Sequence, residues 1–476
     1  MTFNSLVFAV FLLIVFLGYW SLPSRPLIAR NAWLLASSYI FYGWWDWHFL
    51  GLILLNSSVD YLVGRSLHQT ESPKRRKLLL GFSLTTNLGI LGFFKYYDFF
   101  IDSAMEALQA IGFQANFHTL AIILPVGISF YTFQTLSYTI DIYRGKISPT
   151  PNVIAYLAFV SFFPQLVAGP IERASHLLPQ FLQTKNFDLD QAKDGLRQIL
   201  WGLFKKTVVA DNLAPYVEKI YSNYETYPAP MLLLGTVYFA VQIYCDFSGY
   251  SDMAIGTARL FGFDLKRNFA YPYFSRDIGE FWRRWHISLS TWFRDYVYIP
   301  LGGNRTRSTF QHFSNVILTF TISGLWHGAN WTFIIWGLLN GLYYLPPSLR
   351  GPHKHQTEIV AEGRLFPTPL EFFQICRTFL LISFAWIFFR ATSFSHAIGF
   401  ITHIGTANWF GPLRHTKGLW YVLLVMVIDW IQREKPHPLE ITTLPRYTRW
   451  GIYYIISMLI LFLGKTGHVP FIYFQF

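Results

Sequence analysis

The sequence predicts an all-α, polytopic membrane protein with about 11–12 transmembrane helices plus re-entrant or interfacial helices, and three observations predict it. Charged residues make up only 13% of the 476 residues, against about 25% in soluble domains. Hydrophobic residues make up 53% and aromatic residues 19%, with a mean hydropathy of +0.31. Apolar runs also recur along the whole chain. The composition excludes a disordered chain, a coiled coil and a collagen-like fibre.

Each predicted helix is an apolar run that approaches the roughly 20 residues a spanning helix needs. The predicted spans are 6–20, 31–45, 49–64, 78–97, 119–142, 196–214, 230–247, 311–326, 330–347, 371–390, 418–432 and 450–464. No basic segment precedes the first run. We therefore interpret it as a retained helix and not as a signal peptide.

Lys and Arg predict the orientation because they are enriched in cytoplasmic loops. The clusters used for this purpose are Lys74–Lys77, Lys266–Arg307 and Arg433–Arg449, together with Lys193, Lys205 and Lys206. They predict an N-terminus outside the cytoplasm, with Phe476 on the same side. The net charge of +12 is thus interpreted as a topology signal, and nucleic acid is not expected as a partner.

The run 151–170 does not fit a single crossing, because basic residues that look cytoplasmic flank it on both sides. Phe163-Pro164-Gln165 and Ala168-Gly169-Pro170 interrupt it. We therefore expect a re-entrant or broken helix, which a bilayer tolerates only when it is buried in protein or lines a cavity.

The basic stretch from Arg276 to Arg307 is too polar to span and too aromatic for a free loop. Cations and aromatic rings interleave in Phe281-Trp282-Arg283-Arg284-Trp285-His286. One interpretation is a set of helices that lie at the cytoplasmic face or enter the membrane from it. The alternative is an interfacial helix whose arginines extend toward the head groups.

His327 lies between two apolar runs in Ser323-Gly324-Leu325-Trp326-His327-Gly328. An ionisable group at membrane depth is costly and needs a reason. A histidine can move a proton near neutral pH, whereas the alternative is a core histidine at a helix junction. No HExxH pattern or other spaced ligand set accompanies it, so no metal is expected.

Asp246 lies at the end of the predicted span 230–247, and Asp252 follows the span five residues after its end. We expect them to neutralise arginines of the basic stretch, with Asp252 as the N-cap of a following helix. A carboxylate pair for acid–base chemistry is the alternative. Neither a G-x-S-x-G elbow, a P-loop nor a G-x-G-x-x-G fingerprint is present. The two cysteines, Cys245 and Cys376, lie in apolar runs and form no disulfide framework.

Together these residues resemble the membrane-bound O-acyltransferase family. The segments that resemble its bacterial signature are Phe281–Trp292 and Trp326-His327-Gly328. Three others resemble the branch that O-acetylates alginate: Phe162–Ile171, Cys245–Asp252 and Tyr298–Arg305. The resemblance implies one domain over 1–476, with a signature region at about 240–345 and helices around a central tunnel.

The family implies the chemistry and the site. His327 matches its catalytic base and His286 its second polar site residue. The donor is acetyl-CoA or another acyl thioester from the cytoplasm, with Arg283 and Arg284 at the coenzyme phosphates. No permanently bound cofactor is expected. The final acceptor is an exported polysaccharide such as alginate, reached through a periplasmic SGNH-type, esterase-like partner.

Two other functions stay open. The acyl group could go to a lipid or a teichoic-acid-type acceptor. From a different class, the chain could be a transporter of an acyl or sugar intermediate, although no inverted repeat is visible in the sequence.

The aromatic tail 467–476 is unusual for a terminus, which is ordinarily polar and frayed. One interpretation is an interfacial aromatic belt. The other is that the tail folds back toward the site, where Tyr473 acts as an acyl relay beside His327. It resembles the short aromatic C-terminal motif of bacterial O-acylation systems. A phenol forms an ester reactive enough to pass an acyl group on.

Overall fold

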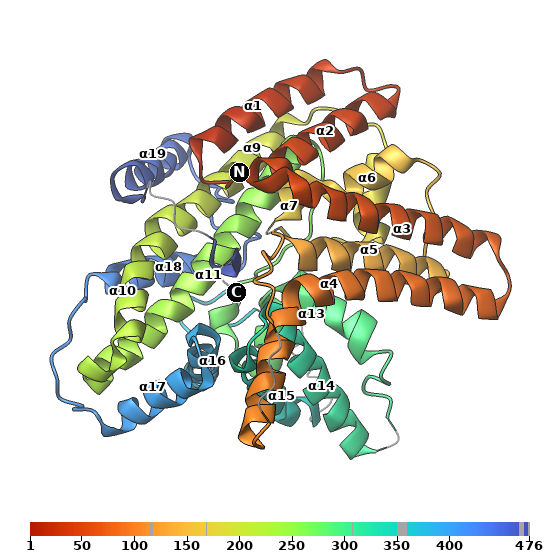
Figure 1. Ribbon diagram of the computed structural model, residues 1–476. Helices are drawn as coiled ribbons and strands as arrows, with labels where there is room; N and C mark the ends of the chain where they lie inside the picture. Colours follow the sequence, from red (N-terminus) through yellow and green to blue (C-terminus); the bar gives the residue numbers. More distant parts are fainter. Residues whose placement is uncertain (114–117, 168, 307, 350–358, 466–470, 475–476) are drawn as a thin grey trace. The chain divides into compact units, whose positions relative to one another are not determined.

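The computed structural model describes residues 1–113, 118–167, 169–306, 308–349, 359–465 and 471–474. Every regular element within these ranges is helical (Figure 1), so the predicted all-α class is confirmed. Three helices of the described chain are both long and apolar enough to cross a bilayer: α4 (Pro73–Ala110), α11 (Ala229–Leu260) and α16 (Pro369–Arg390). Shorter apolar helices accompany them, and the chain is a multi-pass membrane protein.

Two compact units make up the chain: one of residues 1–195 and 254–266, the other of residues 196–253 and 267–476. Helices α9 (Leu189–Phe204) and α11 contribute residues to both.

The first unit contains most of the N-terminal helices. They are α1 (Leu6–Ser21), α2 (Leu27–Asp46), η1 (Trp47–Phe49), α3 (Leu50–Gln69), α4, α5 (Ile128–Tyr143), α6 (Val153–Ser161), α7 (Phe163–Leu166) and α8 (Ala174–Phe181). Helices α3, α4 and α5 pack together (Figure 1). Between them, the buried Asp60 carboxylate accepts hydrogen bonds from Ser83, from Asn87 at 2.9 Å and from Thr139 at 3.0 Å. A buried carboxylate needs such donors.

The interruption predicted within 151–170 is present, because the helix breaks at Phe162 between α6 and α7. Residue 168 lies outside the described residues. The predicted span 119–142 is helical only from Ile128. Gly127 precedes it with φ +76°, and a Cβ there would lie 2.7 Å from the carbonyl oxygen of Leu166. Only glycine fits this position.

The second unit contains the remaining elements. They are η2 (Lys205–Ala210, a π-helix), α10 (Asp211–Ser222), η3 (Tyr224–Thr226), α11, η4 (Pro272–Phe274), α12 (Ile278–Arg284), α13 (Ile287–Phe293), η5 (Arg294–Tyr298, a π-helix), α14 (Thr309–His327), α15 (Trp331–Leu349), α16, α17 (Phe394–Thr406), α18 (Gly418–Ile431), α19 (Arg446–Leu463) and η6 (Ile472–Phe474).

Helices α14 and α15 form a tight antiparallel pair (Figure 1). A Cβ at Gly324 would lie 2.2 Å from the Phe333 carbonyl oxygen, and one at Gly337 would lie 2.4 Å from that of Phe320. The small residues allow the two backbones to approach closely, as in many membrane helix pairs. This packing fixes the C-terminal end of α14, which carries His327.

Candidate active site

His327 is the last residue of α14 and is 3% exposed. Aromatic rings surround its imidazole, with centroid distances of 5.0 Å to Trp336, 5.4 Å to Phe389 and 5.5 Å to Tyr473. These rings keep bulk water away from the imidazole, and the role of His327 as a base stays a prediction.

His286 joins α12 to α13 and has a left-handed backbone, with φ 42° and ψ 56°. Such a conformation is uncommon outside glycine and is often found at functional sites. The side chain is 1% exposed, and its Nδ1 lies 3.2 Å from Oδ1 of Asn268. The amide of Asn268 is oriented by its own Nδ2, which donates to Ser251 Oγ at 3.1 Å.

Asn268 also sets the tautomer of His286. Its Oδ1 accepts a hydrogen bond from Ser288 Oγ at 2.8 Å, so it is an acceptor for the imidazole as well. The hydrogen of His286 then resides on Nδ1, and Nε2 is left as the acceptor nitrogen.

The three residues predicted to be catalytic lie together within the second unit. The ring centroid of His286 is 6.5 Å from that of His327 and 6.5 Å from that of Tyr473. These distances place the residues close together, while their catalytic roles stay predictions.

Phe471 and Ile472 of the C-terminal segment are buried, unlike side chains of an interfacial belt. Phe471 is 0% and Ile472 3% exposed. The backbone N–H of Ile472 donates to Oδ2 of Asp246 at 2.8 Å. The remaining residues of the predicted tail, 467–470 and 475–476, lie outside the described residues.

The expectation for Asp246 and Asp252 is wrong. Helix α11 continues to Leu260, so both lie inside a helix and Asp252 is no N-cap. They pair with lysines instead of arginines: Asp246 with Lys206 at 2.8 Å, and Asp252 with Lys205 at 2.7 Å.

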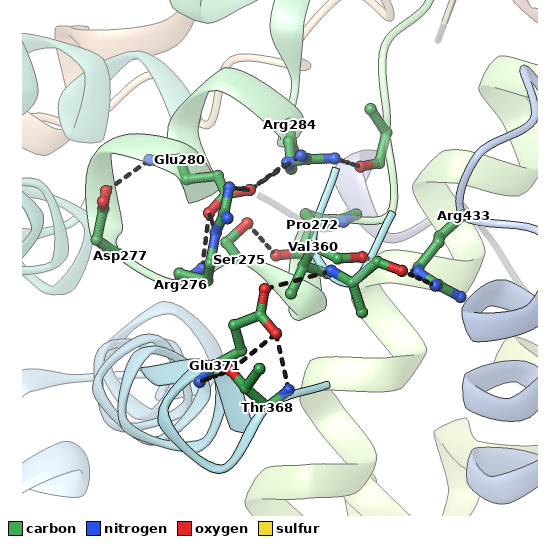
Figure 2. A network of polar contacts seen from close by, with 12 residues as sticks. Pro272, Ser275, Arg276, Asp277, Glu280, Arg284, Val360, Thr368, Glu371 and Arg433 are labelled. Atoms are coloured by element: carbon green, nitrogen blue, oxygen red, sulfur yellow. Dashed lines mark hydrogen bonds and ion pairs between the residues drawn. The ribbon is translucent and has the colours of Figure 1, made fainter. Parts of the chain in front are cut away.

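This pairing also changes how the basic residues are interpreted. Lys205 is 3% and Lys206 0% exposed, and Arg433 donates to the carbonyl oxygen of Val360 in the interior (Figure 2). These three cations are held by protein groups, which accounts for their burial, and the orientation drawn from the basic residues stays a prediction.

The two arginines predicted to hold coenzyme phosphates, Arg283 and Arg284, differ in exposure and in pairing. Figure 2 shows Glu280 between Arg276 and Arg284, with N–O distances of 3.0 and 2.9 Å. Asp277 caps the same helix through the backbone N–H of Glu280 at 2.8 Å. Arg284 thus has a carboxylate partner already, whereas Arg283 is exposed.

The basic stretch contains two seven-residue helices, α12 and α13, followed by the π-helical turn η5, and the two helices have a buried aromatic face. Trp285 is 1% exposed and stacks on Phe281 at 5.5 Å. The chain therefore does not form a single interfacial helix over this stretch. Within the described part of the chain, His, Cys, Asp and Glu form no group of three that would hold a metal ion.

Sequence reasoning missed Asn268 and treated Lys205 and Lys206 as loop residues. Two lysines inside the predicted span 196–214 are a signal that could have been used, since buried cations in a membrane protein mark partners and function. No local pattern around Asn268 predicts its contact with His286.

Comparison with known proteins matches residues 146–390 to the model of the membrane-bound O-acyltransferase family. The chain is 38% identical, over its full length and that of the relative, to a Pseudomonas putida protein named "probable alginate O-acetylase AlgI". It is 42% identical to the protein of that name from Pseudomonas aeruginosa, over 89% of this chain and 81% of the relative. A Helicobacter pylori protein named "peptidoglycan O-acetyltransferase" is 36% identical over 83% of this chain and 78% of the relative.

Proposed function

Because the chain belongs to the membrane-bound O-acyltransferase family, we propose that it takes an acetyl group from cytoplasmic acetyl-CoA and moves it across the inner membrane to O-acetylate an exported polysaccharide such as alginate. That it is a membrane O-acetyltransferase follows from its relatives. The donor, the sidedness, the roles of the residues and the identity of the acceptor are the proposal.

The observation that carries the mechanism is the ring contact between His327 and Tyr473, at 5.5 Å between centroids. His327 accepts the proton of the Tyr473 hydroxyl, and the phenolate oxygen attacks the thioester carbonyl. The carbon–sulfur bond breaks, and the departing thiolate takes the proton from His327. The products are free coenzyme A and an acetyl ester on Tyr473.

His286 serves the second half of the reaction. Its Nδ1–H is directed to Asn268, so its Nε2 accepts the hydrogen of an incoming hydroxyl and orients that group toward the ester. A hydroxyl of the SGNH-type periplasmic partner attacks the acetyl ester, and its proton passes to His286. The Tyr473 oxygen leaves and takes that proton, and the acetylated partner then transfers the acetyl group to a sugar hydroxyl.

Arg283 is the residue of the pair that binds the coenzyme phosphates, because its guanidinium is exposed. Arg284 is paired with Glu280 and contributes to the fold of α12. An exposed guanidinium binds phosphate oxygens in a bidentate manner.

The proposed orientation has a periplasmic N-terminus and places Arg283 at the cytoplasmic face. A cysteine at Arg283 in a background without Cys245 and Cys376 tests it. An impermeant thiol reagent is expected to label this cysteine in inverted membrane vesicles and not in intact spheroplasts. Labelling in spheroplasts alone contradicts the orientation.

The test of the function uses the purified chain in liposomes of bacterial lipids with radiolabelled acetyl-CoA. We expect coenzyme A to be released and label to appear on the protein. A transporter would release no coenzyme A. Coenzyme A release with no label on wild-type protein would instead support direct transfer and contradict the relay.

A further inference from the structure

The C-terminal segment is held at two points by one irregular element, the π-helical turn η2 (Lys205–Ala210). On the N-terminal side of the undescribed residues 466–470, the backbone N–H of Lys465 donates to the carbonyl oxygen of Thr207 at 3.2 Å. Asn212 Nδ2, just beyond the turn, donates to the carbonyl oxygen of Leu463 at 2.8 Å. The chain is therefore fixed to this turn directly before the segment that carries Tyr473.

On the C-terminal side, the connection passes through charged groups. Lys206 Nζ lies 2.8 Å from Asp211 Oδ1 and 2.8 Å from Asp246 Oδ1. The other oxygen of Asp246, Oδ2, accepts the backbone N–H of Ile472 at 2.8 Å. One carboxylate thus joins the lysine of the turn to the backbone next to Tyr473, through charge-assisted hydrogen bonds.

Close packing brings the participating helices to this distance. A Cβ at Gly249 would lie 2.8 Å from the carbonyl oxygen of Gly202 and 3.2 Å from the backbone nitrogen of Lys206. Only glycine permits α11 to approach α9 and the turn so closely. The approach lets Asp246 reach Lys206.

Aromatic rings of α11 complete the contact. Phe471 packs on Tyr250 at 4.4 Å, and Tyr473 packs on Phe247 at 4.5 Å between centroids. Both ring pairs flank the hydrogen bond of Ile472. Residues 246, 247 and 250 lie on neighbouring positions of one helix.

We propose that Asp246, held by Lys206, is a positioning residue that keeps the C-terminal segment docked so that Tyr473 lies beside His327. The proposal rests on the proposed function, since it concerns the residue that carries the acetyl group. Asp246 touches neither donor nor acceptor and acts through the backbone of Ile472. Without it, the segment leaves the site and Tyr473 is no longer presented to the base.

The first experiment measures docking without reference to activity. Ile472→Cys, in a background with Cys245→Ser and Cys376→Ser, places a thiol at a buried position of the segment. Its alkylation by a maleimide in detergent reports how often the segment is released. We expect Asp246→Ala to accelerate alkylation roughly ten- to a hundredfold, the size expected for a lost hydrogen bond to a charged group.

The matched control is Asp252→Ala. Asp252 lies on the same helix, pairs with the neighbouring Lys205 at 2.7 Å and accepts a hydrogen bond from Gln198 Nε2 at 2.8 Å, so among the described residues its polar contacts lead away from the segment. We expect this variant to leave the alkylation rate unchanged. Equal acceleration in both variants would mean that the ion pairs only stabilise the fold, and would overturn the proposal.

A second pair of variants leaves the ion pairs intact, in case Asp246→Ala folds poorly. Ile472→Pro removes the N–H that donates to Asp246 and also replaces the buried side chain, at the first position of a helical turn where proline is sterically tolerated. Ile472→Ala keeps the N–H and shortens the side chain. We expect acetyl labelling of Tyr473 to fall in Ile472→Pro and to survive in Ile472→Ala; equal labelling would overturn the proposal.

The two experiments separate the positioning role from the proposed function. If Tyr473 is no relay, wild-type protein carries no acetyl group, but alkylation still reports whether Asp246 holds the segment. If the positioning role is wrong, wild-type protein is acetylated and Asp246→Ala alkylates no faster than Asp252→Ala.

Discussion

The ring of Tyr473, in the C-terminal segment of the chain, lies 5.5 Å from the ring of His327 at the end of α14. The two rings also share the neighbouring ring of Phe389, at 6.4 Å from Tyr473 and 5.4 Å from His327. A phenol and an imidazole in one apolar enclosure are suited to proton transfer, because a low dielectric would strengthen a hydrogen bond formed between them during the reaction.

Replacing His327 with Ala removes the proposed base. We expect acetyl transfer to fall about 10²- to 10⁴-fold, the usual contribution of a general base. His327→Gln fills more of the space between Trp336 and Phe389 and controls for lost packing, and it should be equally inactive. Steady-state release of coenzyme A measures both. Activity within threefold of wild type in either variant would exclude His327 as the base.

Asn268 is expected to act through His286. Asn268→Ala removes the oxygen that accepts from Nδ1, so the imidazole can rotate or change tautomer. We expect kcat to fall about 10²-fold, the size typical of a small misplacement of a reacting group. The His286→Ala substitution should lower kcat further, because it removes the imidazole itself.

The diagnostic measurement separates the two half-reactions. Acetyl labelling of the protein should persist in Asn268→Ala while transfer to an added acceptor is slow. Loss of folded protein in size-exclusion chromatography would show a structural role instead.

Arg283 and Arg284 should respond in different ways to replacement with Gln. Arg283→Gln should raise the KM for acetyl-CoA with little change in kcat, because a phosphate contact acts alike in ground and transition states. Arg284→Gln leaves Glu280 buried with one cation fewer, and should lower the thermal midpoint. If the KM for acetyl-CoA is unchanged in Arg283→Gln, this arginine does not bind the donor.

His176 in α8 gives the first unit a pH-dependent stability. Hydrogen bonds to Asp264 and Glu172 raise the pKa of His176 from its ordinary value of 6.5 to about 9, although burial opposes this. Because the folded-state pKa is the higher one, the stabilisation is fully present below pH 6.5 and is lost as the pH rises toward about 9.

Thermal unfolding in detergent between pH 6 and pH 10 measures this effect. The midpoint of wild type should exceed that of His176→Asn at the acidic end, and the two should converge at the alkaline end. A difference that grows with pH would contradict the assignment.

The sequence predicted the elements that depend on local patterns. The apolar runs 311–326 and 330–347 agree closely with α14 and α15, because each run is bounded by polar or glycine residues. Helix α17 (Phe394–Thr406) was missed, since it is only 13 residues long. The helical extension of α11 beyond residue 247 was missed because Asp246 and Asp252 look like the end of a span. Their pairing with Lys206 and Lys205 stabilises both carboxylates within the helix.

The candidate site was also predictable only where it depends on local sequence patterns. His286 and His327 lie in motifs that are contiguous in sequence, so the resemblance could point to both. Asn268 and Asp246 contact residues far along the chain, His286 and Ile472. Such contacts depend on how the helices pack, which no local pattern records.

Locating the acetyl group on the protein tests the central claim most directly. The purified chain is incubated with acetyl-CoA without an acceptor, quenched in acid and digested, and the C-terminal peptide is analysed by mass spectrometry. We expect one acetyl group on Tyr473 in wild type, and none on this peptide in Tyr473→Phe or His327→Ala. A Tyr473→Phe variant that acetylates the polysaccharide at the wild-type rate, with no acetyl group on the wild-type peptide, would contradict the account.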